Sequence, residues 1–145
     1  MKRILSLGVI LFTFSNLSIG QECDSLVNVC YKHLSADSRS GKAFISDGQV
    51  YQAFVDAEQS AEFKVTLYGG SLYRIATTAG SDDNYVIFNV YDQDRNLLFT
   101  NSGENKNHPY WDFKIDNTLD CYIEAYLDID KKVSGCLVLL IGFQK

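Results

Sequence analysis

The chain has 145 residues, of which 18 are acidic and 13 are basic, so its formal net charge is −5. This length suits one domain with its own hydrophobic core. The acidic balance argues against nucleic acid and against anionic lipid surfaces as partners, because both need clustered basic side chains.

The first twenty residues have the layout of a secretory signal. Lys2 and Arg3 come first, a mostly apolar run follows from Ile4 to Phe14, and small residues stand at Ser18 and Gly20. The run is too short to span a bilayer, which needs about 20 apolar residues. We therefore expect cleavage after Gly20, with residues 1–20 as a signal peptide.

Removal of the signal peptide changes the charge of the mature chain. Removal of residues 1–20 takes away two cations and no acid, so 11 basic residues face 18 acidic ones, a net charge of −7. No later apolar run is long enough for a transmembrane segment. The sequence predicts a periplasmic or secreted protein.

Residues 21–41 are expected to form an N-terminal helical segment. Cys23, Leu26, Cys30 and Leu34 recur at helical spacing and make one apolar stripe. A polar break over residues 37–41 ends this segment. Residues 42–145 are expected to form the main domain.

From this break onward the hydrophobic period is two, which is typical of half-buried strands. The paired glycines Gly69 and Gly70 and the polar run 92–96 are interpreted as hairpin turns. The continuous apolar run 136–141 indicates a fully buried strand. About eight strands are expected, over residues 49–56, 61–67, 71–78, 86–90, 97–100, 111–115, 121–127 and 136–143. The fold class is therefore all-β, an antiparallel, jelly-roll-like sandwich with a short N-terminal helix.

Four cysteines in an exported chain indicate disulfides. We favour Cys121–Cys136, because these residues begin two late strands and would close a loop of about 15 residues. Cys23–Cys30 would then pair by default, but only outside a regular helix, where residues seven apart lie about 10 Å apart along the axis. Four buried thiols remain an alternative.

Alternation places several tyrosines opposite the apolar side of their strands. An outer face with such tyrosines would stack on sugars or contact a protein. Two alternatives need no partner. The tyrosines lie under the N-terminal helix, or they form ordinary cross-strand pairs that stabilise the sheet. The predicted binding face comprises Tyr85, Tyr91, Tyr110, Tyr122 and Tyr126.

The run from Asp92 through Asp94 to Asn96 matches the first half of a calcium loop. It lacks the glycine at position six and the acid at position twelve. The alternative is a hairpin turn, which favours the same residues for local hydrogen bonds. No metal or other cofactor is expected.

Catalysis has little support in the sequence. The mature chain has two histidines, His33 and His108, and neither belongs to a signature of a catalytic triad. We expect a protein that is not an enzyme.

Three motifs carry a family resemblance: residues 73–75 (YRI), 88–92 (ending VYD) and 96–99 (NLLF). With the flanking strands they resemble the small jelly-roll sandwiches of the bacterial pre-peptidase C-terminal domain and its GOLD-like relatives, over roughly residues 50–143. The resemblance implies a non-catalytic accessory or binding role. The chain departs from the usual setting of that family because no enzyme domain is attached.

Two functions remain as hypotheses. The first is an exported binding module that contacts an unidentified protein or surface glycan. The alternative is a structural accessory subunit of a bacterial envelope assembly.

Overall fold

The computed structural model describes residues 19–36, 38, 40–81, 85–104 and 106–144, which form one helix and eleven strands. The predicted signal peptide falls outside the described residues as far as position 18. The helix is α1 (Ile19–Ser35). The strands are β1 (Ile45–Ser46), β2 (Tyr51–Asp56), β3 (Ser60–Leu67), β4 (Ser71–Thr78), β5 (Val86–Tyr91), β6 (Leu97–Thr100), β7 (Ser102–Gly103), β8 (Lys106–Asn107), β9 (Tyr110–Ile115), β10 (Leu119–Leu127) and β11 (Ser134–Gln144).

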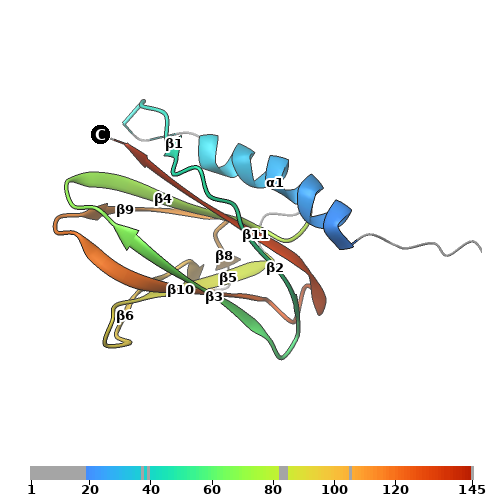
Figure 1. Ribbon diagram of the computed structural model, residues 1–145. Coiled ribbons are helices and arrows are strands. Elements are labelled where there is room, and N and C mark those ends of the chain that lie inside the picture. Colours follow the sequence, from blue (N-terminus) through green and yellow to red (C-terminus); the bar gives the residue numbers. More distant parts are fainter. Residues whose placement is uncertain (1–18, 37, 39, 82–84, 105, 145) are drawn as a thin grey trace, which may run out of the picture.

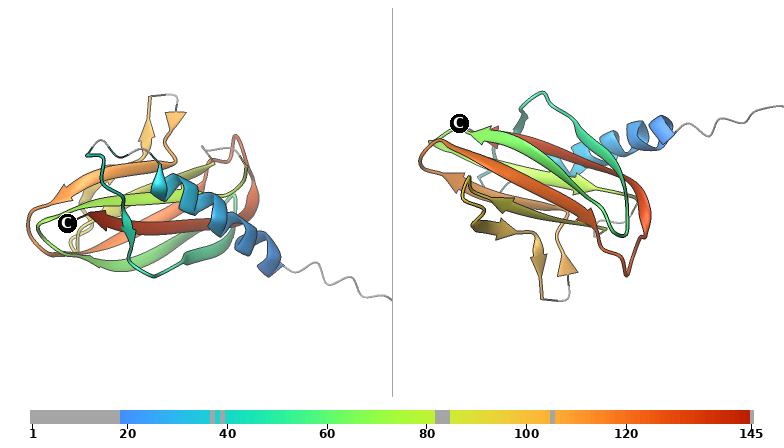
Figure 2. Two further views of the ribbon diagram at one scale, coloured as in Figure 1. Left: turned by 90° about the horizontal axis from the view of Figure 1, so that it is seen from above. Right: turned by 60° about the horizontal axis from the view of Figure 1, so that its bottom comes forward.

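All described strands except β7 and β8, which pair with each other, form two antiparallel sheets that face each other (Figure 1). The covered sheet has the order β1-β11-β4-β9, and β2 also pairs with β11. The open sheet has the order β3-β10-β5-β6. α1 lies on the outer side of the covered sheet, against β11 and β4. The β7–β8 hairpin projects from the sandwich (Figure 2).

The predicted all-β sandwich is confirmed. Each of the eight expected strands corresponds to one of the longer strands, β2–β6 and β9–β11. The additional strands β1, β7 and β8 have two residues each, which is too short for alternation to reveal.

The turn at Gly69 and Gly70 is not the expected hairpin. It joins β3 of the open sheet to β4 of the covered sheet, so these strands do not pair. The turn packs beside the β9–β10 connection, where Gly69 N–H donates to Thr118 Oγ1 at 3.0 Å. A Cβ at Gly69 would lie 2.6 Å from the carbonyl oxygen of Asp116, so the two connections touch only because residue 69 is glycine.

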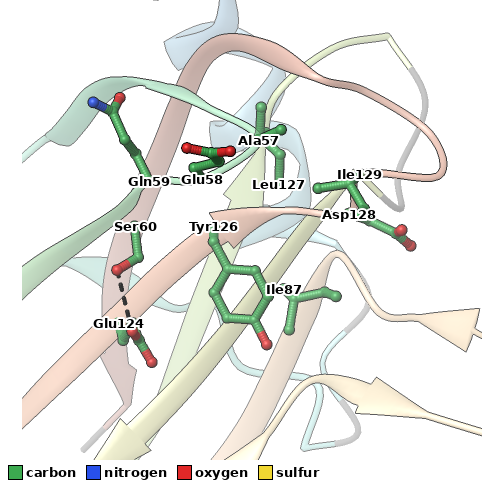
Figure 3. Close-up of a pocket in the computed structure, with 10 residues that line it drawn as sticks. All are labelled: Ala57, Glu58, Gln59, Ser60, Ile87, Glu124, Tyr126, Leu127, Asp128 and Ile129. Carbon is green, nitrogen blue, oxygen red and sulfur yellow. Dashed lines mark hydrogen bonds between the residues drawn. The ribbon is translucent and has the colours of Figure 1, made fainter.

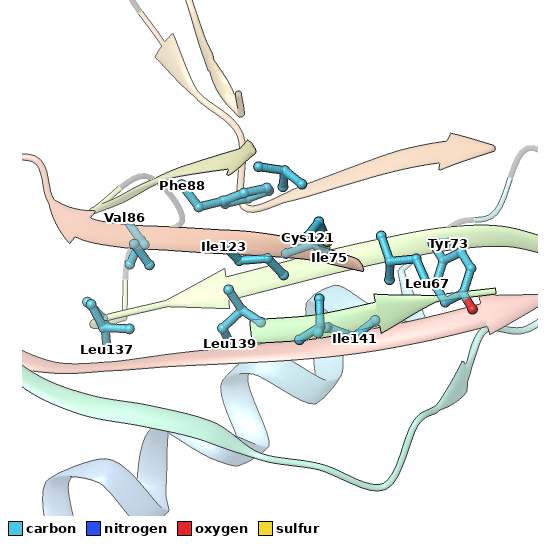
Figure 4. Packing of buried hydrophobic residues seen from close by; sticks show 14 of the residues in the cluster. Leu67, Tyr73, Ile75, Val86, Phe88, Cys121, Ile123, Leu137, Leu139 and Ile141 are labelled. Carbon is cyan, nitrogen blue, oxygen red and sulfur yellow. The ribbon is translucent and has the colours of Figure 1, made fainter. Parts of the chain in front are cut away.

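The main core fills the space between the sheets (Figure 4). Alternate residues of β5 and β10 are buried there, including Phe88, Val90 and Ile123. They meet Leu137, Leu139 and Ile141 of β11 in the same cluster. The period of two in the sequence thus places one side of each sheet in the core.

A second apolar cluster lies between α1 and the covered sheet. The predicted helical stripe, Cys23, Leu26, Cys30 and Leu34, packs here on the outer side of β11 and β4. β11 is therefore buried on both faces, which explains its uninterrupted apolar sequence. No helix in the described part of the chain is long and apolar enough to cross a membrane.

Candidate functional site

The disulfide joins Cys23 of α1 to Cys136 of β11. The predicted pairs Cys121–Cys136 and Cys23–Cys30 are therefore wrong. Cys121 faces the main core from the open sheet, whereas Cys136 faces α1 from the covered sheet. Cys23 and Cys30 both belong to one regular helix, whose geometry keeps residues seven apart too distant to bond.

The remaining cysteines, Cys30 and Cys121, are buried free thiols. Cys30 donates to the carbonyl of Ala76 at 3.2 Å, under α1. Burial raises the pKa of the Cys30 thiol to about 12 and that of Cys121 to about 11. Both cysteines are thus unreactive core residues and not nucleophiles.

A buried arginine anchors the C-terminal end of α1. Arg74 of β4 is fully buried and holds Asp112 of β9 through two bonds of 2.6 and 2.8 Å. Its Nη1 donates to the last carbonyls of the helix region, including that of Ala36 at 2.6 Å. The guanidinium lies between the rings of Phe44 and Tyr110, 4.3 and 4.1 Å from their centroids. This arrangement caps a helix end and balances a buried charge, so it is structural.

Two of the five predicted face tyrosines lie elsewhere. Tyr110 packs into the cluster beneath α1, as the alternative interpretation expected. Tyr85 precedes β5, where strand alternation no longer applies, and packs against the main core. Neither residue belongs to the outer face of the open sheet.

The other three tyrosines share that outer face. Tyr122 of β10 stands directly opposite Tyr91 of β5. Tyr126 lies two residues after Glu124 on the same strand and points to the same side. It stands opposite Ile87 of β5 and Ser60 of β3. α1 packs on the covered sheet, and no described helix or strand lies over this face (Figure 1). We call it the open face.

Acidic side chains lie between the tyrosines of the open face. Glu62 of β3 stands directly opposite Glu124 of β10. Glu124 accepts hydrogen bonds from Ser60 Oγ at 3.1 Å and from the Tyr91 hydroxyl at 3.3 Å. Partial burial, followed by the nearby charge of Glu124, raises the pKa of Tyr91.

One cation of the chain, Arg95, covers part of this face. Its guanidinium bonds both carboxylate oxygens of Glu62, at 2.5 and 3.1 Å, and holds the pKa of Glu62 below its usual range. It also lies 4.1 Å from the centroid of the Tyr122 ring. Arg95 thus forms an ion pair and a cation–π contact on the open face.

At the end of the open face, beside Tyr126, lies a pocket of about 350 Å³ (Figure 3). The β2–β3 turn and the start of the β10–β11 loop form its rim, and Ile87, Glu124 and Tyr126 line it from the sheet. Sequence reasoning placed Tyr126 on an outer face but missed the pocket, because three separate segments build it. The lining residues are Ala57, Glu58, Gln59, Ser60, Ile87, Glu124, Tyr126, Leu127, Asp128 and Ile129.

The half calcium motif forms the β5–β6 turn. The carboxylate of Asp92 accepts the backbone N–H groups of Asp94 and Asn96, at 2.8 and 2.9 Å, and the Asn96 amide at 2.9 Å. Its oxygens thus serve the local hydrogen bonds expected of a hairpin turn. Within the described residues, no three acidic, histidine or cysteine side chains are grouped as metal ligands.

No protein family and no curated protein matches the sequence. Among solved structures, the fold is similar to that of PliG from Aeromonas hydrophila, a periplasmic lysozyme inhibitor of g-type lysozyme. The TM-score is 0.51 at 12% sequence identity, and the match covers 66% of this chain and 85% of that chain. The likeness supports a small β-rich fold, while the resemblance to pre-peptidase C-terminal domains finds no matching family.

Proposed function

We propose that this protein is an exported, non-catalytic module that binds a basic protein through its open face. The observation that carries the proposal is the contrast between the two sheets. α1 covers one outer side, whereas the other presents Tyr91, Tyr122 and Tyr126 with no covering element among the described residues. Tyrosine is enriched in protein interfaces because its ring is apolar and its hydroxyl forms hydrogen bonds.

The charge of the face supports a basic partner. Three acids, Glu62, Glu124 and Asp120, point outward from β3 and β10. The cations on the same face are Lys64 and Arg95. The chain as a whole is acidic. Complementary charge accelerates association and selects among partners.

Export is supported by the predicted signal peptide and by the Cys23–Cys136 disulfide, since disulfides persist in oxidising compartments. The similarity in fold to a periplasmic lysozyme inhibitor suggests which protein to test first as a partner. A secreted cell-wall hydrolase such as a g-type lysozyme is a protein of the proposed compartment.

The test measures binding of the purified exported protein to a g-type lysozyme and to a panel of basic and acidic proteins, by biolayer interferometry. Peptidoglycan is included as a glycan probe. We expect salt-sensitive binding to a basic protein that is lost in the double variant Tyr122→Ala/Tyr126→Ala. Tyr31→Ala and Asp24→Asn are the controls, because both residues are exposed on α1, which packs on the covered sheet.

Equal binding by the double variant and by the controls would place the contact elsewhere. Binding to peptidoglycan alone would assign the open face to a sugar and contradict a protein partner. A parallel assay of lysozyme activity shows whether a bound hydrolase is also inhibited.

A further inference from the structure

The open face contains two neighbouring groups that each combine a tyrosine with a glutamate. We call the first the completed site because Arg95 occupies it, whereas no described cation occupies the second. In the completed site, Arg95 lies on the Tyr122 ring and bonds Glu62 through its two terminal nitrogens, Nη1 and Nη2. The pocket beside it offers the same two kinds of group, Tyr126 and Glu124, from the same strand.

The register of β3 and β10 explains why the two sites are neighbours. Glu62 and Glu124 stand directly opposite each other, between Tyr122 and Tyr126. Like charges in such a cross-strand pair repel each other. Arg95 bonds Glu62 and lies near enough to Glu124 to interact with its charge, but the hydrogen bonds that Glu124 accepts come from the hydroxyl groups of Ser60 and Tyr91.

No described cation forms an ion pair with Glu124 or with Glu58 on the rim. The third acid of the pocket, Asp128, is already bonded by Lys131 at 3.0 Å. The pocket therefore has two carboxylates without an ion pair to a described cation, Glu58 and Glu124, and the ring of Tyr126 lies beside Glu124 (Figure 3).

The rest of the pocket is apolar. Ile87 and Ile129 both line it, and Ile129 is an exposed hydrophobic residue. A side chain with an apolar stem and a cationic head fits such a lining. Arginine fits better than lysine, because a planar guanidinium can lie on a ring and bond a carboxylate at the same time, as Arg95 does with Tyr122 and Glu62.

From this repetition we infer that the pocket receives an arginine side chain of the partner protein. The guanidinium lies against Tyr126 and bonds Glu124, and the stem lies against Ile87. This inference rests on the proposed function for its partner, but the pocket can be tested without one.

The probe is the capped tripeptide acetyl-Gly-Arg-Gly-amide, titrated into the ¹⁵N-labelled exported protein and followed by NMR amide shifts. We expect saturable shifts confined to residues 57–60, 87 and 124–129. The citrulline analogue, which has the same shape without the charge, should bind about tenfold more weakly or not at all. The lysine analogue should bind more weakly than the arginine peptide.

Two variants test the contacts. Glu124→Gln keeps the size of the acid and one of its two acceptor oxygens but removes the charge, and Tyr126→Leu keeps apolar bulk without the ring. Each should weaken binding of the arginine peptide about fivefold or more. Asp24→Asn and Tyr68→Ala, outside the pocket, should leave binding unchanged.

Absence of saturable shifts, equal affinity for the citrulline peptide, or full affinity in Glu124→Gln would each overturn the inference. If only the peptide fails while a basic protein still binds the open face, the pocket is not the anchor and the proposed function stands. If the peptide binds but no basic protein does, the proposed function fails and the guanidinium site stands.

Discussion

Cys23 and Cys136 are linked across 113 residues of sequence, so one bond fastens α1 to the strand that is buried on both faces. Closing a loop of this length stabilises the folded state by about 5 kcal/mol in the chain-entropy model. The double variant Cys23→Ser/Cys136→Ser should therefore melt about 10–20 °C lower in a thermal scan.

Thiol counting checks the connectivity separately. The denatured, unreduced protein should react with a thiol reagent at two cysteines, Cys30 and Cys121, and the reduced protein at four. Cys121→Ala is the matched control, because it removes a thiol but keeps the disulfide. Four reactive thiols before reduction would contradict the bond.

A second prediction concerns Arg74 and Asp112. Arg74→Lys keeps the charge but loses the planar fork that bonds both carboxylate oxygens and the helix carbonyls. Because Arg74 is fully buried, we expect a loss of about 3 kcal/mol in the free energy of unfolding. Amide exchange in α1 should accelerate more than exchange in β10.

The control is Arg95→Lys, which alters an exposed bidentate pair with Glu62. Exposed ion pairs contribute little, so its denaturation midpoint should stay close to that of the unmodified protein. Equal losses in the two variants would show that burial and helix capping do not distinguish Arg74.

A third prediction is loss of stability in alkali. In the unfolded chain, thiols release their protons near pH 9, whereas the folded chain keeps them until about pH 12 at Cys30 and about pH 11 at Cys121. Above pH 9 the unfolded state thus binds fewer protons, and the free energy of unfolding falls by up to about 1.4 kcal/mol per pH unit for each thiol. This stability is fully present below pH 9.

Urea unfolding between pH 8.5 and 10 measures the slope. Cys30→Ala and Cys121→Ala should each make the decline shallower, since each removes one of the two thiols while the disulfide remains. An unchanged slope in both variants would show that other groups cause the alkaline loss.

Local sequence patterns predicted the strands, the helix and the β5–β6 hairpin, but not which sheet each strand joins. The period of two located β10 and β11 correctly, and their succession suggested that Cys121 and Cys136 were neighbours. The chain instead crosses to the other sheet after β10, as it does at Gly69, so these cysteines face different clusters. Alternation describes one strand at a time and carries no information on which sheet the strand joins.

The candidate site shows the same division. Alternation correctly turned Tyr122 and Tyr126 away from the core, and it turned Tyr110 outward as well. What it could not supply is that α1 covers the outer side of one sheet and leaves the other bare. Arg74 had a weak signal, as the one charged residue of the strand 71–78, but its partner lies 38 residues away.

The last prediction follows from the neighbouring cation sites. Arg95→Ala uncovers Tyr122, breaks the ion pair of Glu62 and removes the positive charge near Glu124. The variant should therefore bind the arginine tripeptide more tightly, and amide shifts should spread from the pocket to Tyr122 and Glu62. Adding Glu62→Gln to the variant should confine the shifts to the pocket again, because the second carboxylate is gone. If Arg95→Ala weakens binding in a still-folded protein, Arg95 itself contributes to the pocket, and the two sites do not act as separate copies.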